Sequence, residues 1–250
     1  MQIHFIYLII FIYGILIGSF LNVCIYRIPR KENIITTKSH CMSCGYVLKW
    51  YDLFPVFSYL FLGGKCRRCG TKLSLQYPTM ELINGLCYVL IFYIHGFTLE
   101  SVLFALGTSA LLVLSVIDFR TYEIPVGINI FILILGLLRV ALDYRHMIDY
   151  ILGFVSVSGV LLLLFLVTKG RGIGGGDIKL MAAVGLLLGL KLTILAFILG
   201  CVLGSVLHLL RMKIKGADSL LAFGPYLSLG IFISIVFGNQ MITWYLNYLQ

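Results

Sequence analysis

Long hydrophobic runs occupy most of this 250-residue chain and leave room for little other than a membrane fold. Hydrophobic residues make up 60% of the chain and the mean hydropathy is +1.04, whereas soluble domains are about 45–50% apolar. A helix needs roughly 17–25 apolar residues to cross about 30 Å of hydrocarbon. The sequence therefore predicts an all-α polytopic membrane protein with about eight transmembrane helices. The runs cover approximately residues 4–26, 80–97, 101–118, 126–142, 149–168, 178–190, 192–211 and 223–246.

Two of these runs carry further information. The break after the sixth run, from Gly189 to Lys191, is weak, so seven spans are the alternative count. The first run lacks the basic n-region of a secretory signal and is longer than an h-region, so we expect a retained first span. Within it, Gly14 and Gly18 match the small-xxx-small pattern of closely packed membrane helices.

The basic residues predict the orientation of these spans. If eight spans start from an outside N-terminus, all of the 19 Lys and Arg residues except Arg139, Arg145 and Lys191 lie on the inner side. Lys and Arg near span ends are retained in the cytoplasm, so we expect the N-terminus outside. The net charge of +9 then reflects orientation in the lipid bilayer, and we expect no nucleic-acid partner.

The one sizeable polar insertion, residues 27–79, contains two C-x-x-C knuckles. Cys41 and Cys44 form the first knuckle. Cys66 and Cys69 form the second, and 21 residues separate the two. Paired knuckles at this spacing predict a small cytoplasmic zinc-ribbon-like domain, in which four thiolates close a structural zinc site. Iron or disulfides are the alternatives, although a cytosolic loop is kept reduced.

Two aspartates lie at the ends of apolar runs, where an ionisable side chain costs about 2.5–3.5 kcal/mol if it reaches the bilayer centre. Asp118 closes the third run, and Asp177 follows three consecutive glycines and opens the sixth. Glycine costs about 1 kcal/mol per residue inside a helix, so we expect residues 170–176 to be irregular and to border a cavity. Both aspartates face the cytoplasm in the predicted topology. Paired carboxyls around one water are the arrangement of aspartic-protease hydrolysis.

Other interpretations compete with this dyad. Aspartate is a common N-cap, so Asp177 alone could merely begin a helix. A glycine-rich loop before a helix can bind phosphate, but no G-K-S/T motif follows it here. A proton- or ion-coupled transporter would also use paired aspartates, although transporter sites lie near the bilayer midplane within inverted repeats. A membrane-anchored zinc-ribbon binding module would not need eight spans.

The order and spacing of several motifs resemble the type IV prepilin peptidases, which are membrane aspartic endopeptidases of the G-x-G-D class. The resemblance extends over nearly the whole chain. Each motif is weak alone, and together they are specific. They are Gly18–Pro29, the two knuckles, Tyr77–Leu82, Asp118 with Ile124-Pro125, Gly174–Leu180 and Phe223–Tyr226.

This resemblance implies that Asp118 and Asp177 are the catalytic pair, which removes a short basic leader from type IV prepilin or pseudopilin precursors. The cut is expected after a glycine, on the cytoplasmic face of the bacterial cytoplasmic membrane. The resemblance also implies methylation of the new N-terminal amine with S-adenosylmethionine, by an activity that depends on the cysteine loop. The expected domains are a first transmembrane helix (1–26), the loop domain (27–79) and a peptidase core (80–250). Glu81 and Asn84 could touch the amine or the donor, or could serve as a helix-start acid and an interhelical amide.

Overall fold

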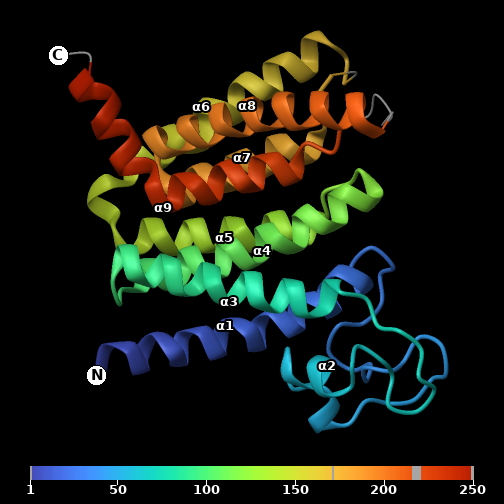
Figure 1. Ribbon diagram of the computed structural model, residues 1–250. Helices are drawn as coiled ribbons and strands as arrows, with labels where there is room; N and C mark the ends of the chain where they lie inside the picture. The colour runs from blue at the N-terminus through green and yellow to red at the C-terminus, as the bar shows by residue number, and fades with distance from the viewer. Residues whose placement is uncertain (1, 171, 216–220, 249–250) are drawn as a thin grey trace. The chain divides into compact units, whose positions relative to one another are not determined.

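The computed structural model describes residues 2–170, 172–215 and 221–248, and their secondary structure is helical apart from two isolated bridges. Arg171, which the orientation argument included, lies outside this part of the chain. Eight long helices occupy the positions of the eight predicted runs (Figure 1). They are α1 (Gln2–Arg27), α3 (Gln76–His95), α4 (Leu99–Thr121), α5 (Val126–Leu142), α6 (Met147–Val167), α7 (Gly175–Leu188), α8 (Leu190–Lys215) and α9 (Gly224–Tyr248). The loop adds the short helices η1 (Trp50–Asp52) and α2 (Phe57–Phe61), and η2 (Tyr144–His146) precedes α6.

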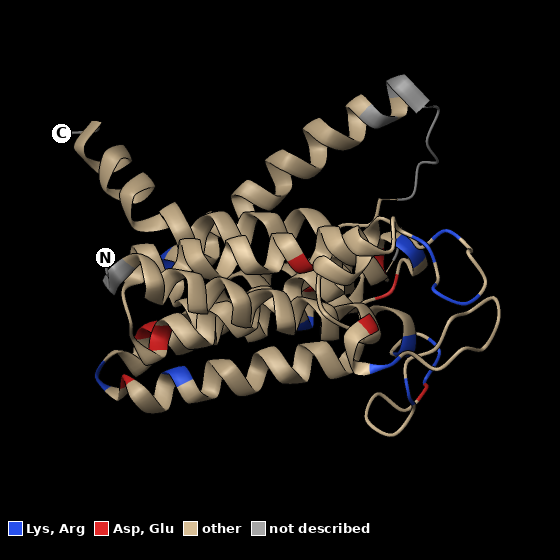
Figure 2. Cartoon of the chain, turned by 60° about the horizontal axis from the view of Figure 1, so that its bottom comes forward, with Lys and Arg blue, Asp and Glu red and all other residues tan. Residues whose placement is uncertain are grey.

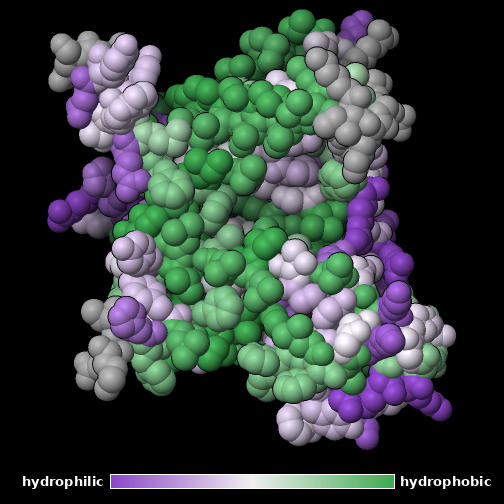
Figure 3. Space-filling model, viewed as in Figure 1, coloured by the Kyte–Doolittle hydropathy of each residue, from purple (hydrophilic) through white to green (hydrophobic). Residues whose placement is uncertain are grey.

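Six of the described helices are long and apolar enough to cross a membrane, namely all of the eight except α5 and α7. The shorter two have 17 and 14 residues, and at about 1.5 Å per residue α7 reaches only ~21 Å. The structure contains the predicted break between the sixth and seventh runs, because Gly189 adopts a φ of +79° between α7 and α8. Hydrophobic residues cover the outer surface of the helices, as expected for a multi-pass membrane protein (Figure 3).

The chain divides into two compact units, Met1–Thr98 and Leu99–Gln250. In the first unit α1 packs along α3. The predicted close contact at Gly14 and Gly18 is confirmed, since a Cβ at Gly18 would lie 2.7 Å from the Cα of Glu81. Asn84 donates a hydrogen bond to the carbonyl of Gly14 over 2.7 Å, so it is the interhelical amide that the sequence allowed.

The second unit contains α4 to α9, and α7 forms its centre. This helix packs against α5 and α6, and nine of its 14 residues are buried. Close approach to α6 requires glycine, because a Cβ at Gly185 would collide with the carbonyl of Gly153. The sixth run is too short to span lipid alone. It forms a short helix whose apolar residues pack mainly against neighbouring helices.

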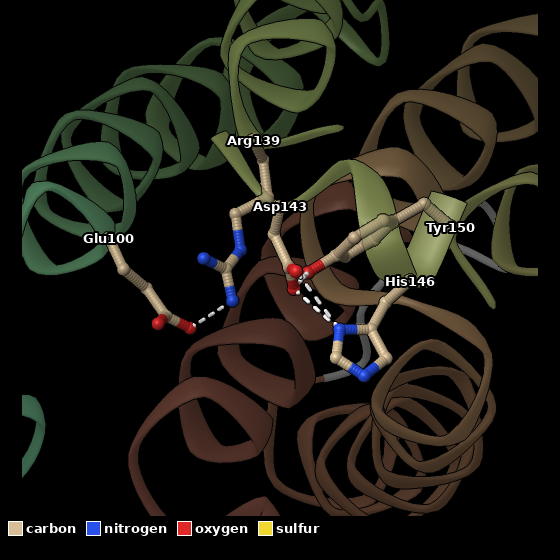
Figure 4. A network of polar contacts seen from close by, with 5 residues as sticks. All are labelled: Glu100, Arg139, Asp143, His146 and Tyr150. Carbon is tan, nitrogen blue, oxygen red and sulfur yellow. Dashed lines mark hydrogen bonds and ion pairs between the residues drawn. The ribbon is translucent and has the colours of Figure 1, made fainter. Parts of the chain in front are cut away.

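A polar network lies at the start of α4 and the end of α5 (Figure 4). Arg139 pairs with Glu100 over 2.5 Å, and its guanidinium lies 5.7 Å from the ring centre of Tyr150. Tyr150 donates to Asp143 over 2.9 Å, and His146 contacts the same carboxylate. Glu100 is 18 residues from Asp118 along α4, or about 27 Å, so this network lies far from the predicted catalytic pair.

Candidate active site and metal centre

Asp118 lies three residues before the end of α4 and is 5% exposed. Its Oδ2 accepts a hydrogen bond of 2.8 Å from the backbone N–H of Gly224, the first residue of α9. A Cβ at Gly224 would lie 2.7 Å from this same oxygen. Only glycine therefore lets the backbone of α9 approach the carboxylate closely enough to donate.

Asp177 lies in the first turn of α7 and is 9% exposed. The irregular loop ends earlier than predicted, because α7 begins at Gly175 after an extended Gly174. Two of the three glycines are thus helical. At Gly176 the reason is packing, since a Cβ there would lie 2.9 Å from the Cβ of Ile124.

The fold brings the two aspartates to one cavity of about 380 Å³. Asp118 comes from α4 and Asp177 from α7, and the three glycines at the start of α7, Gly174–Gly176, form part of the wall. Glu123 and Lys179 also line the cavity. Two nearly buried carboxyl groups beside one space can hold a water between them, which is the arrangement that acid–base hydrolysis requires.

Two residues of this site were not predicted from the sequence. The sequence marks Gly224 only as part of the Phe223–Tyr226 motif, and the expected site does not include Asn129. Asn129 is 4% exposed, donates from Nδ2 to the carbonyl of Gly176 over 3.3 Å, and lines the same cavity. Its Oδ1 is buried without a hydrogen-bond partner. An amide inside an apolar run was the available signal, because such side chains need partners within the protein.

The four knuckle cysteines form the second candidate site. The sulfur atoms of Cys41, Cys44, Cys66 and Cys69 all lie within 4.8 Å of one another. Cys41 and Cys69 are 3.8 Å apart, which is about the separation that two Zn–S bonds of about 2.3 Å make in a tetrahedron. That separation is too long for a disulfide, whose S–S bond is about 2.05 Å. The donor set therefore fits one tetrahedral zinc ion.

Both knuckles have the same backbone. The N–H of Gly45 donates to the carbonyl of Cys41 over 2.9 Å, and that of Gly70 donates to Cys66 over the same distance. Gly45 and Gly70 have φ values of +68° and +70°, which favour glycine. Hydrogen bonds from the Thr71 hydroxyl and backbone lower the pKa of Cys69 to about 6, and the thiolate is the form that binds a metal.

An ion pair joins the segment after the first knuckle to the second knuckle. Arg67 contacts Asp52 over 2.7 Å, and the Asp52 side chain is 2% exposed. Tyr46 and the backbone N–H of Lys49 also donate to this carboxylate. Burial alone would raise the pKa of Asp52, but these hydrogen bonds and the Arg67 charge hold it below its ordinary value. The pair thus ties the second knuckle to the segment after the first.

Fold and site together define a multi-pass membrane protein with a buried pair of carboxyl groups and a separate four-cysteine centre. Two family models match the chain: the bacterial peptidase A24 N-terminal domain over residues 12–95, and the type IV leader peptidase family over residues 105–209. The chain belongs to the type IV leader peptidase family.

Full-length relatives support this membership. A Bacillus subtilis protein named prepilin leader peptidase/N-methyltransferase is 32% identical, with 96% of this chain and 97% of the relative covered. Proteins of the same name from Xanthomonas campestris and Pseudomonas aeruginosa are 30% and 29% identical, each covering 94% of this chain and 92% and 91% of the relatives. No solved structure matches the chain. The comparisons give no support to the transporter alternative.

Proposed function

We propose that this protein cleaves the basic leader of type IV prepilin-like precursors, with Asp118 and Asp177 as the catalytic pair. The observation that carries the proposal is the shared cavity, which is lined by two nearly buried carboxyl groups of residues 59 positions apart in the chain. Among the described residues that line the cavity, Glu123 contributes a third carboxyl group and Lys179 is the one cation. A surplus of acidic groups suits a basic leader, and the cut would follow a glycine of the precursor.

The chemistry needs one ionised and one protonated carboxyl group. The carboxylate would take a proton from the shared water, whose oxygen adds to the scissile carbonyl, while the acid protonates the carbonyl oxygen. Collapse of the tetrahedral intermediate returns a proton to the leaving amine and breaks the C–N bond. The Gly224 N–H would orient Asp118 throughout, because it occupies one lone pair of Oδ2.

The same chain would methylate the new N-terminal amine, as the names of its relatives indicate. S-adenosylmethionine would supply the methyl group, and we assign no residue to it. Zinc held by Cys41, Cys44, Cys66 and Cys69 would be structural, because four thiolates leave no open coordination position. The region on which methylation depends would lie before residue 90, and the two aspartates would not belong to it. We place the protein in the bacterial inner membrane, with the N-terminus outside and the active site facing the cytoplasm.

The test is leader removal from a purified precursor by Asp118→Asn and Asp177→Asn variants in detergent or nanodiscs. Asparagine keeps the shape but cannot exchange the proton, so we expect losses of at least about 10²–10⁴-fold. Asp143→Asn is the matched control, because its carboxylate belongs to the distant network of Figure 4, and it should cleave normally. Near-normal cleavage by either folded site variant would exclude the dyad.

Methylation gives an independent readout on the same preparations. Asp177→Asn should still methylate a precut pilin whose N-terminus is exposed, while knuckle variants should cleave but methylate poorly. Mass spectrometry of the precut pilin with the methyl donor would show one added CH₂. No added mass from active, zinc-loaded wild-type protein would mean that the chain is a peptidase only.

A further inference from the structure

The loop of the first unit displays an aromatic segment, Trp50–Phe61, to its surroundings. Trp50 is 77% exposed, Leu60 67% and Phe61 88%. Trp50, Phe54, Phe57 and Phe61 line an open groove of about 460 Å³. Exposed apolar patches of this kind mark contact with a protein or a membrane. The contacts and charges around this segment distinguish the two.

A hydrogen bond connects the segment to a membrane helix of the same unit. The backbone N–H of Val56 donates to Glu81 Oε2 over 2.7 Å, and Glu81 is 5% exposed. Val56 has a φ of +62°, which is strained for a β-branched residue. Strain of this kind persists only where surrounding contacts hold it, so the Glu81 carboxylate is a specific anchor for the segment.

The position of Glu81 sets the depth of the segment. α3 begins at Gln76 and is long and apolar enough to span a membrane. Glu81 lies five residues further along, which is about 7.5 Å at 1.5 Å per residue. Amphipathic segments that lie in a membrane interface bury their apolar face by about 5–10 Å. With the start of α3 taken as the membrane surface, the contact with Glu81 puts Val56 at the level of the interface.

The charges beside the segment suit the same location. Lys49 Nζ lies 5.8 Å from the ring centre of Tyr51, and the Arg67 guanidinium lies 5.0 Å from it. The basic residues of the first unit gather on the loop, whereas its two long helices are almost free of them (Figure 2). Tryptophan and aromatic rings flanked by Lys and Arg are typical of surfaces that bind anionic lipid headgroups. Hydrophobic residues also gather at the region labelled α2 (Figures 1 and 3).

We propose that Trp50–Phe61 inserts its aromatic side chains into the interface of the bilayer that α1 and α3 cross, with the flanking cations on anionic headgroups. The segment is a monotopic anchor between two spans. It holds the four-cysteine centre against the membrane surface, because Asp52 within it pairs with Arg67 of the second knuckle. The proposal does not depend on the peptidase reaction.

Depth-dependent fluorescence quenching tests this proposal, because the chain has only two tryptophans, Trp50 and Trp244. Both are replaced by phenylalanine, and Phe61→Trp then reports on the segment. Ile35→Trp in the same background is the matched control, since Ile35 is 92% exposed and lies in the same loop outside the segment. The full-length proteins are placed in nanodiscs that contain phosphatidylglycerol, with or without lipids brominated on the acyl chain.

We expect the tryptophan at position 61 to emit at shorter wavelength and to lose most of its intensity in brominated nanodiscs. The tryptophan at position 35 should instead be quenched by aqueous acrylamide and ignore the brominated lipid. Equal acrylamide quenching at both positions, with no effect of bromine, would overturn the proposal and leave the groove to a protein partner. A Trp244→Phe protein repeats the measurement on native Trp50, so the result does not rest on a substituted segment.

Discussion

Gly224→Ala is the sharpest test of how the fold positions the candidate dyad. The added Cβ would lie 2.7 Å from Asp118 Oδ2 and 2.9 Å from Leu114 Cδ2, whereas ordinary contact begins at 3.4 Å. The carboxylate or the start of α9 must therefore move by about 0.7 Å. This movement breaks the 2.8 Å hydrogen bond from the Gly224 N–H. A hydrogen bond to a charged group is worth about 1.5–3 kcal/mol, and a 1 Å misplacement can cost about 10²-fold in rate.

We therefore expect Gly224→Ala to lower kcat for leader cleavage by about 10–100-fold. The assay is cleavage of a leader-bearing precursor at saturating concentration in nanodiscs, with the thermal unfolding midpoint of the variant as the folding control. Gly127→Ala is the matched substitution, because a Cβ at Gly127 meets nothing within 4 Å and alanine favours the helix. A folded Gly224→Ala protein that cleaves as fast as the Gly127→Ala protein would refute the role assigned to this contact.

Three further predictions concern other parts of the chain. Cys41→Ser should reduce zinc from about one ion per chain towards none and loosen the loop, because structural zinc contributes its binding free energy to folding; elemental analysis and proteolysis check this, and a metal-free wild-type protein would contradict it. Asn129→Ala should slow cleavage about 3–10-fold by releasing the Gly176 carbonyl, as expected for a neutral hydrogen bond of about 0.5–1.5 kcal/mol; an unchanged kcat would remove Asn129 from the site. Arg139→Met should lower the thermal unfolding midpoint in detergent, since it leaves Glu100 without its 2.5 Å partner, yet leave cleavage unchanged; lost cleavage in a folded variant would show that the network reaches the active site.

Much of the fold follows from local properties of the chain. Hydrophobic length predicts the eight long helices, and Gly14 and Gly18 predict where α1 approaches α3. The knuckles predict their own geometry, because each is a turn of five residues with glycine at the position of positive φ. Asp118 and Asp177 stand out because carboxyl groups are expensive beside apolar runs. Spacing and composition are enough for all of these.

The environment of each group depends on residues far away in the chain. The N–H that orients Asp118 comes from a residue 106 positions later, and the amide that holds Gly176 in the first turn of α7 comes from 47 positions earlier. The bond between Val56 and Glu81 likewise joins a strained turn to a membrane helix 25 residues on. Periodicity and composition describe how a segment is built, but they do not say which segments meet. Sequence alone thus determined the helices, the knuckles and the two acids, whereas the tertiary structure decided which backbone and amide groups surround those acids and which carboxylate binds the aromatic segment.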